Sequence, residues 1–181
     1  YYVKPADIIE YRAVQELKAN RFDEAIKWFE QDNASGNKEL YGNPFTIHIT
    51  DCHDCDHSAP QKTKYTKYTF TLKLKELLAN AESLKDSDER AQNYFLLANG
   101  LYNLTYYGNA RMVSLIYPFT EYDRGNYYSG DDYLKGGCES AMMYYQKAMS
   151  FSTRKEFKAK CAWMCAKCEL NNWYATKDYE E

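Results

Sequence analysis

Along most of this chain, hydrophobic residues recur three and four positions apart, the spacing that gathers them on one face of an α-helix. The spacing begins after Pro5 and runs to Leu17, breaks at Asn20-Arg21, and resumes over residues 22–29. A proline suits the first turn of a helix, and so short a break makes two consecutive helices fold back on each other. The pattern therefore predicts an antiparallel helix pair at the start of the chain.

Four further helices are predicted later in the chain. Helical spacing continues over residues 70–84 and 95–108, over a segment that starts at Cys138, and over a last segment after Ser152 and Thr153. Either of those two hydroxyl side chains can cap the start of the last helix. The first turns of the helix over 70–84 also show the alternation of a strand, which leaves that boundary open. Together with the first pair, these segments predict an all-α fold of three antiparallel helix pairs.

Two segments interrupt the helical pattern, and we interpret both as insertions in a single domain that spans residues 1–181. In residues 38–66, a turn at Gly42-Asn43-Pro44 precedes hydrophobic residues that alternate with polar ones from Phe45 to Ile49, as in a short strand. Residues 109–132 are rich in Tyr, Gly and Asp and predict an irregular loop.

The predicted helices share one recurrent contact, an alanine followed four residues later by a large side chain. It occurs at Ala13 and Leu17, Ala98 and Tyr102, and Ala166 and Leu170, and on partner helices at Ala25 and Phe29 and at Ala141 and Tyr145. Small residues let paired helices approach closely, and the large residue fills the gap one turn further on. Together with the turn sequence Asn20-Arg21-Phe22-Asp23-Glu24-Ala25-Ile26, this pattern resembles the tetratricopeptide-repeat family.

The resemblance covers residues 5–32 and 88–173 and stops at the two insertions. The spacing of small and large residues would also suit other α-solenoids. What the family implies is a short right-handed solenoid of helix pairs whose concave face binds a protein or peptide. The family implies no catalytic residues for this chain.

Charge and composition narrow the classes of function. Lys and Arg total 23 against 26 Asp and Glu, so the formal net charge is −3 and no basic footprint predicts nucleic-acid binding. No apolar run approaches the length of a membrane span. The chain opens at Tyr1 without an initiator Met or a signal pattern, so we interpret it as a piece of a longer protein. Its six Cys leave both a cytoplasmic and an extracytoplasmic location open.

The strongest chemical signal is a cluster of Cys and His within the first insertion. Cys52 and Cys55 stand at the C-x2-C spacing, with His57 two residues further on. Thiolate and imidazole ligands select zinc or a similar divalent ion, and four such ligands close a structural site. His53 is the nearest fourth ligand, and His48 is another. The sequence thus predicts a structural metal site that fixes a polar loop.

Other interpretations of the cluster stay open at the level of sequence. Cys52 and Cys55 could form a local disulfide in an oxidising compartment, or both could be inert thiols. A catalytic metal centre would need an open ligand position and a general base, for which Asp54 or Asp56 is available. Nothing else in the chain predicts a substrate pocket around them.

A second group of thiols lies in the last predicted helix. Cys161, Cys165 and Cys168 fall on one helical face, and Cys138 of the preceding helix could add a fourth ligand for a metal ion. We favour packing over metal binding for this group, because Cys behaves as a small buried hydrophobe and paired helices need small residues at their contacts.

Aromatic residues in the second insertion form a candidate surface for a partner or ligand. This surface comprises Tyr117, Phe119, Tyr122, Tyr127 and Tyr128. Tyr supplies contact area at low entropic cost, and loops carry function more often than the elements they join. The alternative is a loop that folds back over the ends of the helices.

These observations predict a non-catalytic scaffold that binds a protein or peptide and carries a structural zinc-like site. One alternative is a metal-dependent enzyme centred on Cys52–His57. Another is an extracytoplasmic scaffold that binds carbohydrate, which rests only on the abundance of Tyr and Asn.

Overall fold

The computed structural model describes residues 3–40, 42–47, 63–105, 107–114, 116 and 137–176. These residues form α1 (Pro5–Lys18), α2 (Phe22–Phe29), α3 (Asn33–Gly36), α4 (Lys67–Ser83), α5 (Ser87–Asn103), the short 3-10 helix η1 (Arg111–Val113), α6 (Glu139–Phe151) and α7 (Lys155–Thr176). Within the described ranges there is no β-strand, only an isolated bridge between Glu39 and Thr66. The prediction of an all-α fold is confirmed.

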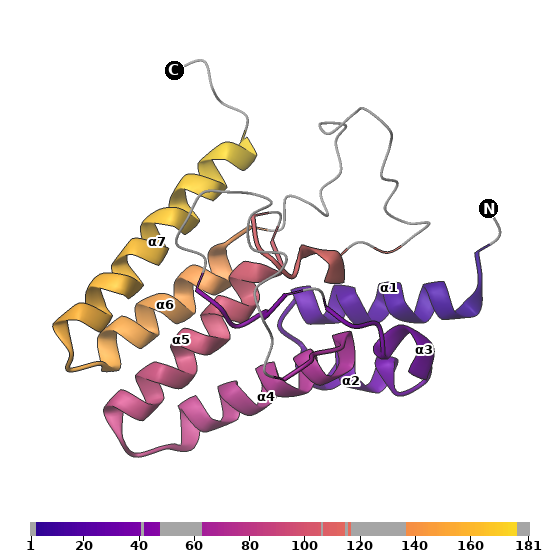
Figure 1. Cartoon of the computed structure of the whole chain (residues 1–181), viewed down its shortest axis with the longest axis horizontal. Coiled ribbons are helices and arrows are strands. Elements are labelled where there is room, and N and C mark those ends of the chain that lie inside the picture. The colour runs from indigo at the N-terminus through magenta and orange to yellow at the C-terminus, as the bar shows by residue number, and fades with distance from the viewer. Residues whose placement is uncertain are drawn as a thin grey trace.

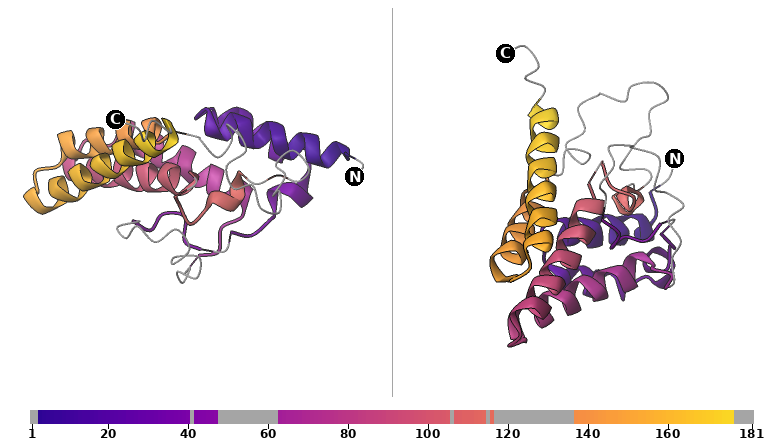
Figure 2. Two further views of the ribbon diagram at one scale, coloured as in Figure 1. Left: turned by 90° about the horizontal axis from the view of Figure 1, so that it is seen from above. Right: turned by 60° about the vertical axis from the view of Figure 1, so that its left-hand side comes forward.

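The longer helices pack in the order in which they follow along the chain. α1 packs on α2, α2 on α4, α4 on α5, α5 on α6, and α6 on α7. Figure 1 shows α1 and α2 at one end of this row and α7 along the opposite edge. Figure 2 shows the same separation from two further directions. One side of α7 therefore faces away from the rest of the helices.

The turn between α1 and α2 depends on Asn20. Its backbone is left-handed, with φ at 59°, a conformation that Asn tolerates better than most residues. The N–H of Asn20 donates to the carbonyl of Leu17, and that of Arg21 donates to the carbonyl of Glu16. These bonds satisfy the last carbonyls of α1 and reverse the chain into α2 within three residues.

The insertion predicted at residues 38–66 is closed at its base. The N–H of Leu40 donates to the carbonyl of Tyr65 at 2.8 Å, and the N–H of Lys67 donates to the carbonyl of Lys38 at 3.1 Å. An exposed ion pair joins Lys64 to Glu39 at 3.1 Å. The two ends of the insertion therefore meet beside the start of α4.

The strand expected from Phe45 onward does not form in the described residues 42–47. Buried amides of α5 take the place of a strand partner there. Nδ2 of Asn103 donates to the carbonyls of Pro44 and Thr46, each at 2.9 Å, and Nδ2 of Asn99 donates to the carbonyl of Phe45 at 3.0 Å. Because side chains satisfy these carbonyls, the segment needs no neighbouring strand.

A buried ion pair ties α1 to α4. Glu10 is 2% exposed and Lys67 3% exposed, and Oε1 of Glu10 lies 2.6 Å from Nζ of Lys67. Nζ of Lys67 also donates to the carbonyl of Val113 at 2.9 Å, and Lys38 contacts the other carboxylate oxygen. Burial lowers the pKa of Lys67, and Glu10 opposes that shift. Three separate segments of chain are joined at this one carboxylate.

Two predictions about the last helix need correction. It begins at Lys155 rather than directly after Thr153, because the side chains of Ser152 and Thr153 both donate to Asp88 on α5. Ala166 and Leu170, expected to repeat the buried contact of Ala13 and Leu17, are both exposed. The other members of that pattern, on α1, α2, α5 and α6, are buried as expected.

Candidate functional site

The helix α7 is apolar on two opposite faces. Its inner face packs on α6 and carries the buried residues Phe157, Cys161, Met164, Cys168 and Asn171. Its outer face carries Ala159, Ala162, Trp163, Ala166, Leu170 and Trp173, which helical geometry places on the opposite side. An apolar stripe on each side is typical of a helix that is covered from both directions.

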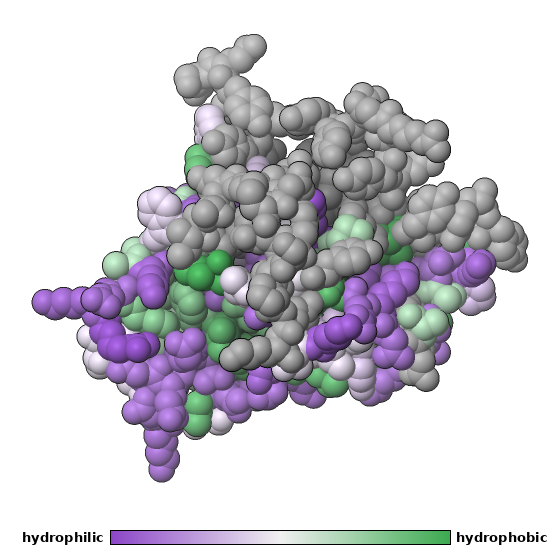
Figure 3. Space-filling view, in the orientation of Figure 1, coloured by the Kyte–Doolittle hydropathy of each residue, from purple (hydrophilic) through white to green (hydrophobic). Residues whose placement is uncertain are grey.

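The outer face of α7, defined by those six residues, exposes large side chains. Trp163 is 54% exposed, Trp173 47% and Leu170 40%. Single exposed apolar residues are ordinary, but three large ones on one helical face are a feature of binding surfaces. The view in Figure 3 shows hydrophobic residues gathered over α5 and α6 and hydrophilic ones along the lower edge of the molecule.

Positive charge flanks the first turns of α7. Arg154, Lys155, Lys158 and Lys160 are all exposed there, with Glu156 as the one acidic residue among them. The guanidinium of Arg154 lies over the ring of Phe157, with 5.0 Å between Cζ and the ring centroid. The exposed surface of α7 is therefore cationic at its N-terminal end and apolar further along the helix.

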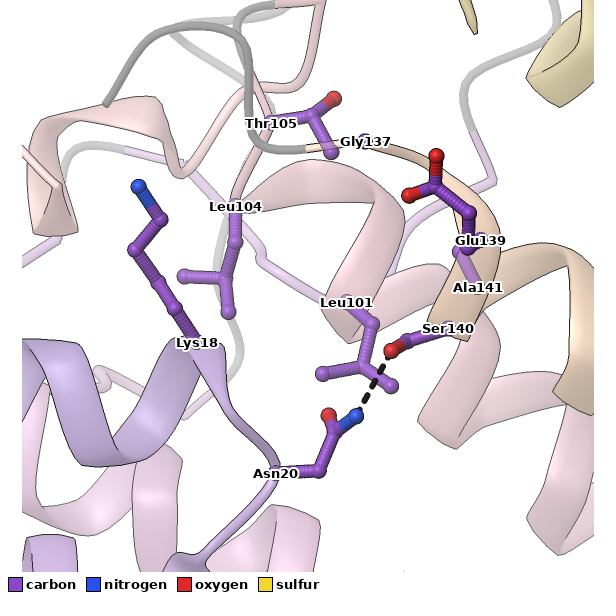
Figure 4. Close-up of a pocket in the computed structure, with 9 residues that line it drawn as sticks. All are labelled: Lys18, Asn20, Leu101, Leu104, Thr105, Gly137, Glu139, Ser140 and Ala141. Carbon is purple, nitrogen blue, oxygen red and sulfur yellow. Dashed lines mark hydrogen bonds between the residues drawn. The ribbon is translucent and has the colours of Figure 1, made fainter. Parts of the chain in front are cut away.

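A pocket of about 160 Å³ lies where the α1–α2 turn, the end of α5 and the start of α6 meet. Figure 4 shows Lys18 on one side, Glu139 on the other, and Leu101 and Leu104 between them. Nδ2 of Asn20 donates to the hydroxyl of Ser140 at 2.7 Å, a bond that joins the α1–α2 turn to α6. Burial lowers the pKa of Lys18.

Two thiols lie where α6 begins beside α7, and neither is among the residues that line this pocket. Cys138 precedes the first residue of α6 and stands between Gly137 and Glu139, both of which line the pocket. Nδ2 of Asn171 approaches Sγ of Cys138 at 3.9 Å, and Cys168 lies one turn before Asn171 on the same face of α7. A hydrogen bond between Cys138 and Cys168 lowers the pKa of Cys138 and raises that of Cys168.

The remaining described thiols serve the helix contact. Cys161 is fully buried, and burial raises its pKa to about 12. Cys165 is half-buried, and its thiol points to the carbonyl of Met142 on α6 at 3.9 Å. In the part of the chain that the structure describes, no three His, Cys, Asp or Glu side chains are grouped to hold a metal ion. Cys161 and Cys168 are both fully buried, as the packing interpretation expects.

The site residues predicted from sequence lie outside the described residues. This applies to the predicted metal ligands Cys52, His53, Cys55 and His57, with His48, and to the aromatic residues Tyr117, Phe119, Tyr122, Tyr127 and Tyr128. The outer face of α7 was missed in the sequence, whereas Cys138 and Cys168 were grouped there as possible ligands of one metal ion. A helical projection of residues 155–176 does show two opposite apolar stripes, but the pairing of Cys138 with Cys168 depends on how α6 and α7 pack.

Comparison with known proteins does not assign this chain to a family. A scan against protein-family models and searches of curated proteins and of solved structures give no match for this chain. Among the described helices, none has both the length and the hydrophobicity that crossing a bilayer requires.

Proposed function

We propose that this chain is a non-catalytic scaffold that binds an amphipathic helix of a partner protein along the outer face of α7. The single observation that carries the proposal is the exposure of Trp163, Leu170 and Trp173 on one side of a helix whose other side is already packed. Trp is among the residues that contribute most to protein interfaces, because it buries a large rigid surface.

The kind of partner follows from the arrangement of side chains. On α1 and α5, an alanine with a large residue one turn further on is buried against a neighbouring helix, as at Ala98 and Tyr102. Ala166 and Leu170 present the same arrangement to the outside. A helix is therefore the element that would fill this face, and the exposed Lys155 and Lys158 favour acidic residues at its matching end.

Within this proposal, the Cys/His segment is a structural zinc site formed by Cys52, Cys55, His57 and His53. What supports it is the ligand chemistry together with the closed base of the insertion, where Leu40 bonds to Tyr65. In the same proposal, the consecutive helices that pack on one another are tetratricopeptide-like pairs. In this proposal, the aromatic residues of 109–132 remain a second candidate surface.

The test uses a display library of helical peptides that carry alanine and a large apolar residue four positions apart, with polar scrambled peptides as the reference. We expect the selected peptides to shift the Trp fluorescence of the chain to shorter wavelength on binding. Trp163→Glu should weaken binding by about 30-fold, the effect of losing a residue worth about 2 kcal/mol in an interface. The matched control is Met143→Glu, because Met143 is 40% exposed on α6.

Two results would contradict the proposal. One is binding that is equally sensitive to the Met143 and Trp163 variants. The other is a dimer of the chain alone that dissociates when Trp163 is changed, which light scattering after size-exclusion chromatography would reveal. In that second case the face binds another copy of this chain and not a foreign helix.

A further inference from the structure

The outer face of α7 changes in shape along the helix. The small residues Ala159, Ala162 and Ala166 occupy its first part, whereas the large exposed residues Leu170 and Trp173 occupy its last part. At a rise of about 1.5 Å per residue, the two ends of this face are about 21 Å apart along the axis. A helix that packs along α7 therefore meets a low surface near the start of α7 and a raised one near its end.

The charge of α7 changes in the same direction. Lys155, Lys158 and Lys160 are exposed near its start, and no carboxylate of the described residues pairs with them. In the rest of α7 that the structure describes, Glu169 is the one exposed charged residue. Positive charge near a helix N-terminus is unfavourable, because the helix dipole is positive there too. Acidic groups of a partner would offset that repulsion at the end where the surface is low.

We infer that the partner helix binds antiparallel to α7, with small apolar residues near its own N-terminus and bulky apolar residues, followed by acidic ones, near its C-terminus. The inference rests on the proposed function and adds to it the order of side chains in the partner and the direction in which the partner lies.

The order of sizes follows from how large and small residues match between helices. Gly100 on α5 leaves a space that α4 fills, since a Cβ atom at Gly100 would lie 2.7 Å from Cδ2 of Leu74 and 3.3 Å from Cε2 of Phe70. On α7, Trp163 stands at one edge of the outer face and borders the space over the alanines. Bulky partner residues fill that space, and small ones lie opposite the raised end, because facing bulky residues would hold the helices apart.

The direction of the partner follows from the positive end of α7. In an antiparallel pair, the C-terminus of the partner lies beside Lys155 and Lys158, whose ammonium groups stabilise its last carbonyls. A parallel partner would instead place a second positive helix N-terminus there. α6 already packs on α7 in the antiparallel sense, because the N–H of Cys138 at the start of α6 donates to Oδ1 of Asn172 near the end of α7, at 2.9 Å.

The experiment measures the affinity of the whole chain for three labelled helical peptides of one composition, by fluorescence anisotropy. The first peptide carries Ala early, Leu and Phe late, and Glu at its end. The second has the reverse sequence, and the third keeps the apolar order of the first but carries its Glu residues at the start. We expect the first peptide to bind about tenfold more tightly than either of the others.

A charge reversal on α7 locates the acidic end of the bound peptide. Lys158→Glu should weaken binding of the first peptide about tenfold and change binding of the third by less than about twofold, because the Glu residues of the third lie at the far end of α7. The matched control is Lys85→Glu, which alters an exposed lysine between α4 and α5 and should leave all three affinities unchanged. Circular dichroism verifies that both variants are folded.

The outcomes separate this inference from the proposed function. If the second peptide binds as tightly as the first, or if Lys158→Glu and Lys85→Glu act alike, the order and direction inferred here are wrong. The proposed function still stands in that case, provided that Trp163→Glu weakens every peptide that binds. If none of the three peptides binds, or if a second copy of the chain occupies the face in a dimer that depends on Trp163, both the proposed function and this inference are overturned.

Discussion

At the scale of single residues, the most consequential pair is Glu10 and Lys67, because both charges are buried. Glu10→Gln would leave the ammonium group of Lys67 in the core without its counter-charge. We expect the free energy of unfolding to fall by about 3–5 kcal/mol, the usual cost of breaking a buried pair by removing one partner. Unfolding in urea measures the change.

The control for this prediction is an exposed pair of the same chemistry. Glu39 pairs with Lys64 at the surface, where the side chain of Glu39 is 60% exposed and that of Lys64 is 74% exposed. Glu39→Gln should change the free energy of unfolding by less than about 1 kcal/mol. Equal effects of the two substitutions would mean that the carboxylate of Glu10 does not hold α1 on α4.

Asp88 gives the chain a distinct response to acid. Its carboxylate accepts from the backbone N–H and hydroxyl of Thr153, at 3.0 and 2.8 Å, and from the hydroxyl of Ser152 at 2.9 Å. These bonds, the one from the Thr153 N–H foremost, lower the pKa of Asp88 below its ordinary value of 3.8. The ionised carboxylate of Asp88 therefore ties the start of α5 to the α6–α7 turn more strongly than its protonated form does.

The sign of the pH dependence follows from that shift. Because the pKa is lower in the folded than in the unfolded chain, the stabilisation is present above pH 3.8 and is lost as the pH falls through the folded pKa. As the pH falls through the folded pKa of Asp88, we expect the free energy of unfolding to decrease less in Asp88→Asn than in the wild type. Urea unfolding at a series of pH values measures the two decreases. Identical pH profiles for the two proteins would contradict this.

At the scale of elements, α7 separates residues that hold the fold from residues that are exposed. Met164 on its inner face is fully buried, while Leu170 on its outer face is 40% exposed. Met164→Ala should lower the free energy of unfolding by about 2–4 kcal/mol, because it leaves a cavity in the contact with α6. Leu170→Ala should change it by no more than about 0.5 kcal/mol. Comparable losses from both would show that the outer face belongs to the core of the fold.

Most helices could be predicted from the sequence because local signals define them. Pro5 at the first turn and the left-handed Asn20 bound α1 in the sequence and in the structure. For α7, periodicity predicts a helix but not which of two apolar stripes faces inward, since that depends on where α6 lies. Residues 45–47 show the opposite case, because the amides of Asn99 and Asn103 override a local strand pattern from more than fifty positions away.

At the scale of the whole molecule, the all-α fold follows from the sequence, whereas the pairing of distant groups does not. Glu10 and Lys67 meet only because α1 and α4 pack through α2, and Cys138 meets Cys168 only because α6 and α7 run alongside each other. No spacing along the chain signals the contact of Glu10 with Lys67, and the sequence grouped Cys138 with the thiols of the last helix only as possible metal ligands. The Cys/His cluster is the reverse, a chemical signal that is entirely local in sequence.

That difference predicts how the whole molecule responds to loss of the proposed zinc site. Changing Cys52 and Cys55 together to Ser should lower the zinc content from about one ion per chain to none, measured by elemental analysis of protein purified without added chelator. The helical circular dichroism should stay nearly unchanged, because the core of α1, α2 and α4–α7 is built from residues outside the cluster. Changing Cys161 and Cys165 to Ser is the matched control and should leave the zinc content as it was. If the double variant of Cys52 and Cys55 unfolds the helices, the cluster and the helices form one cooperative unit. Zinc would then stabilise the whole fold and not the insertion alone.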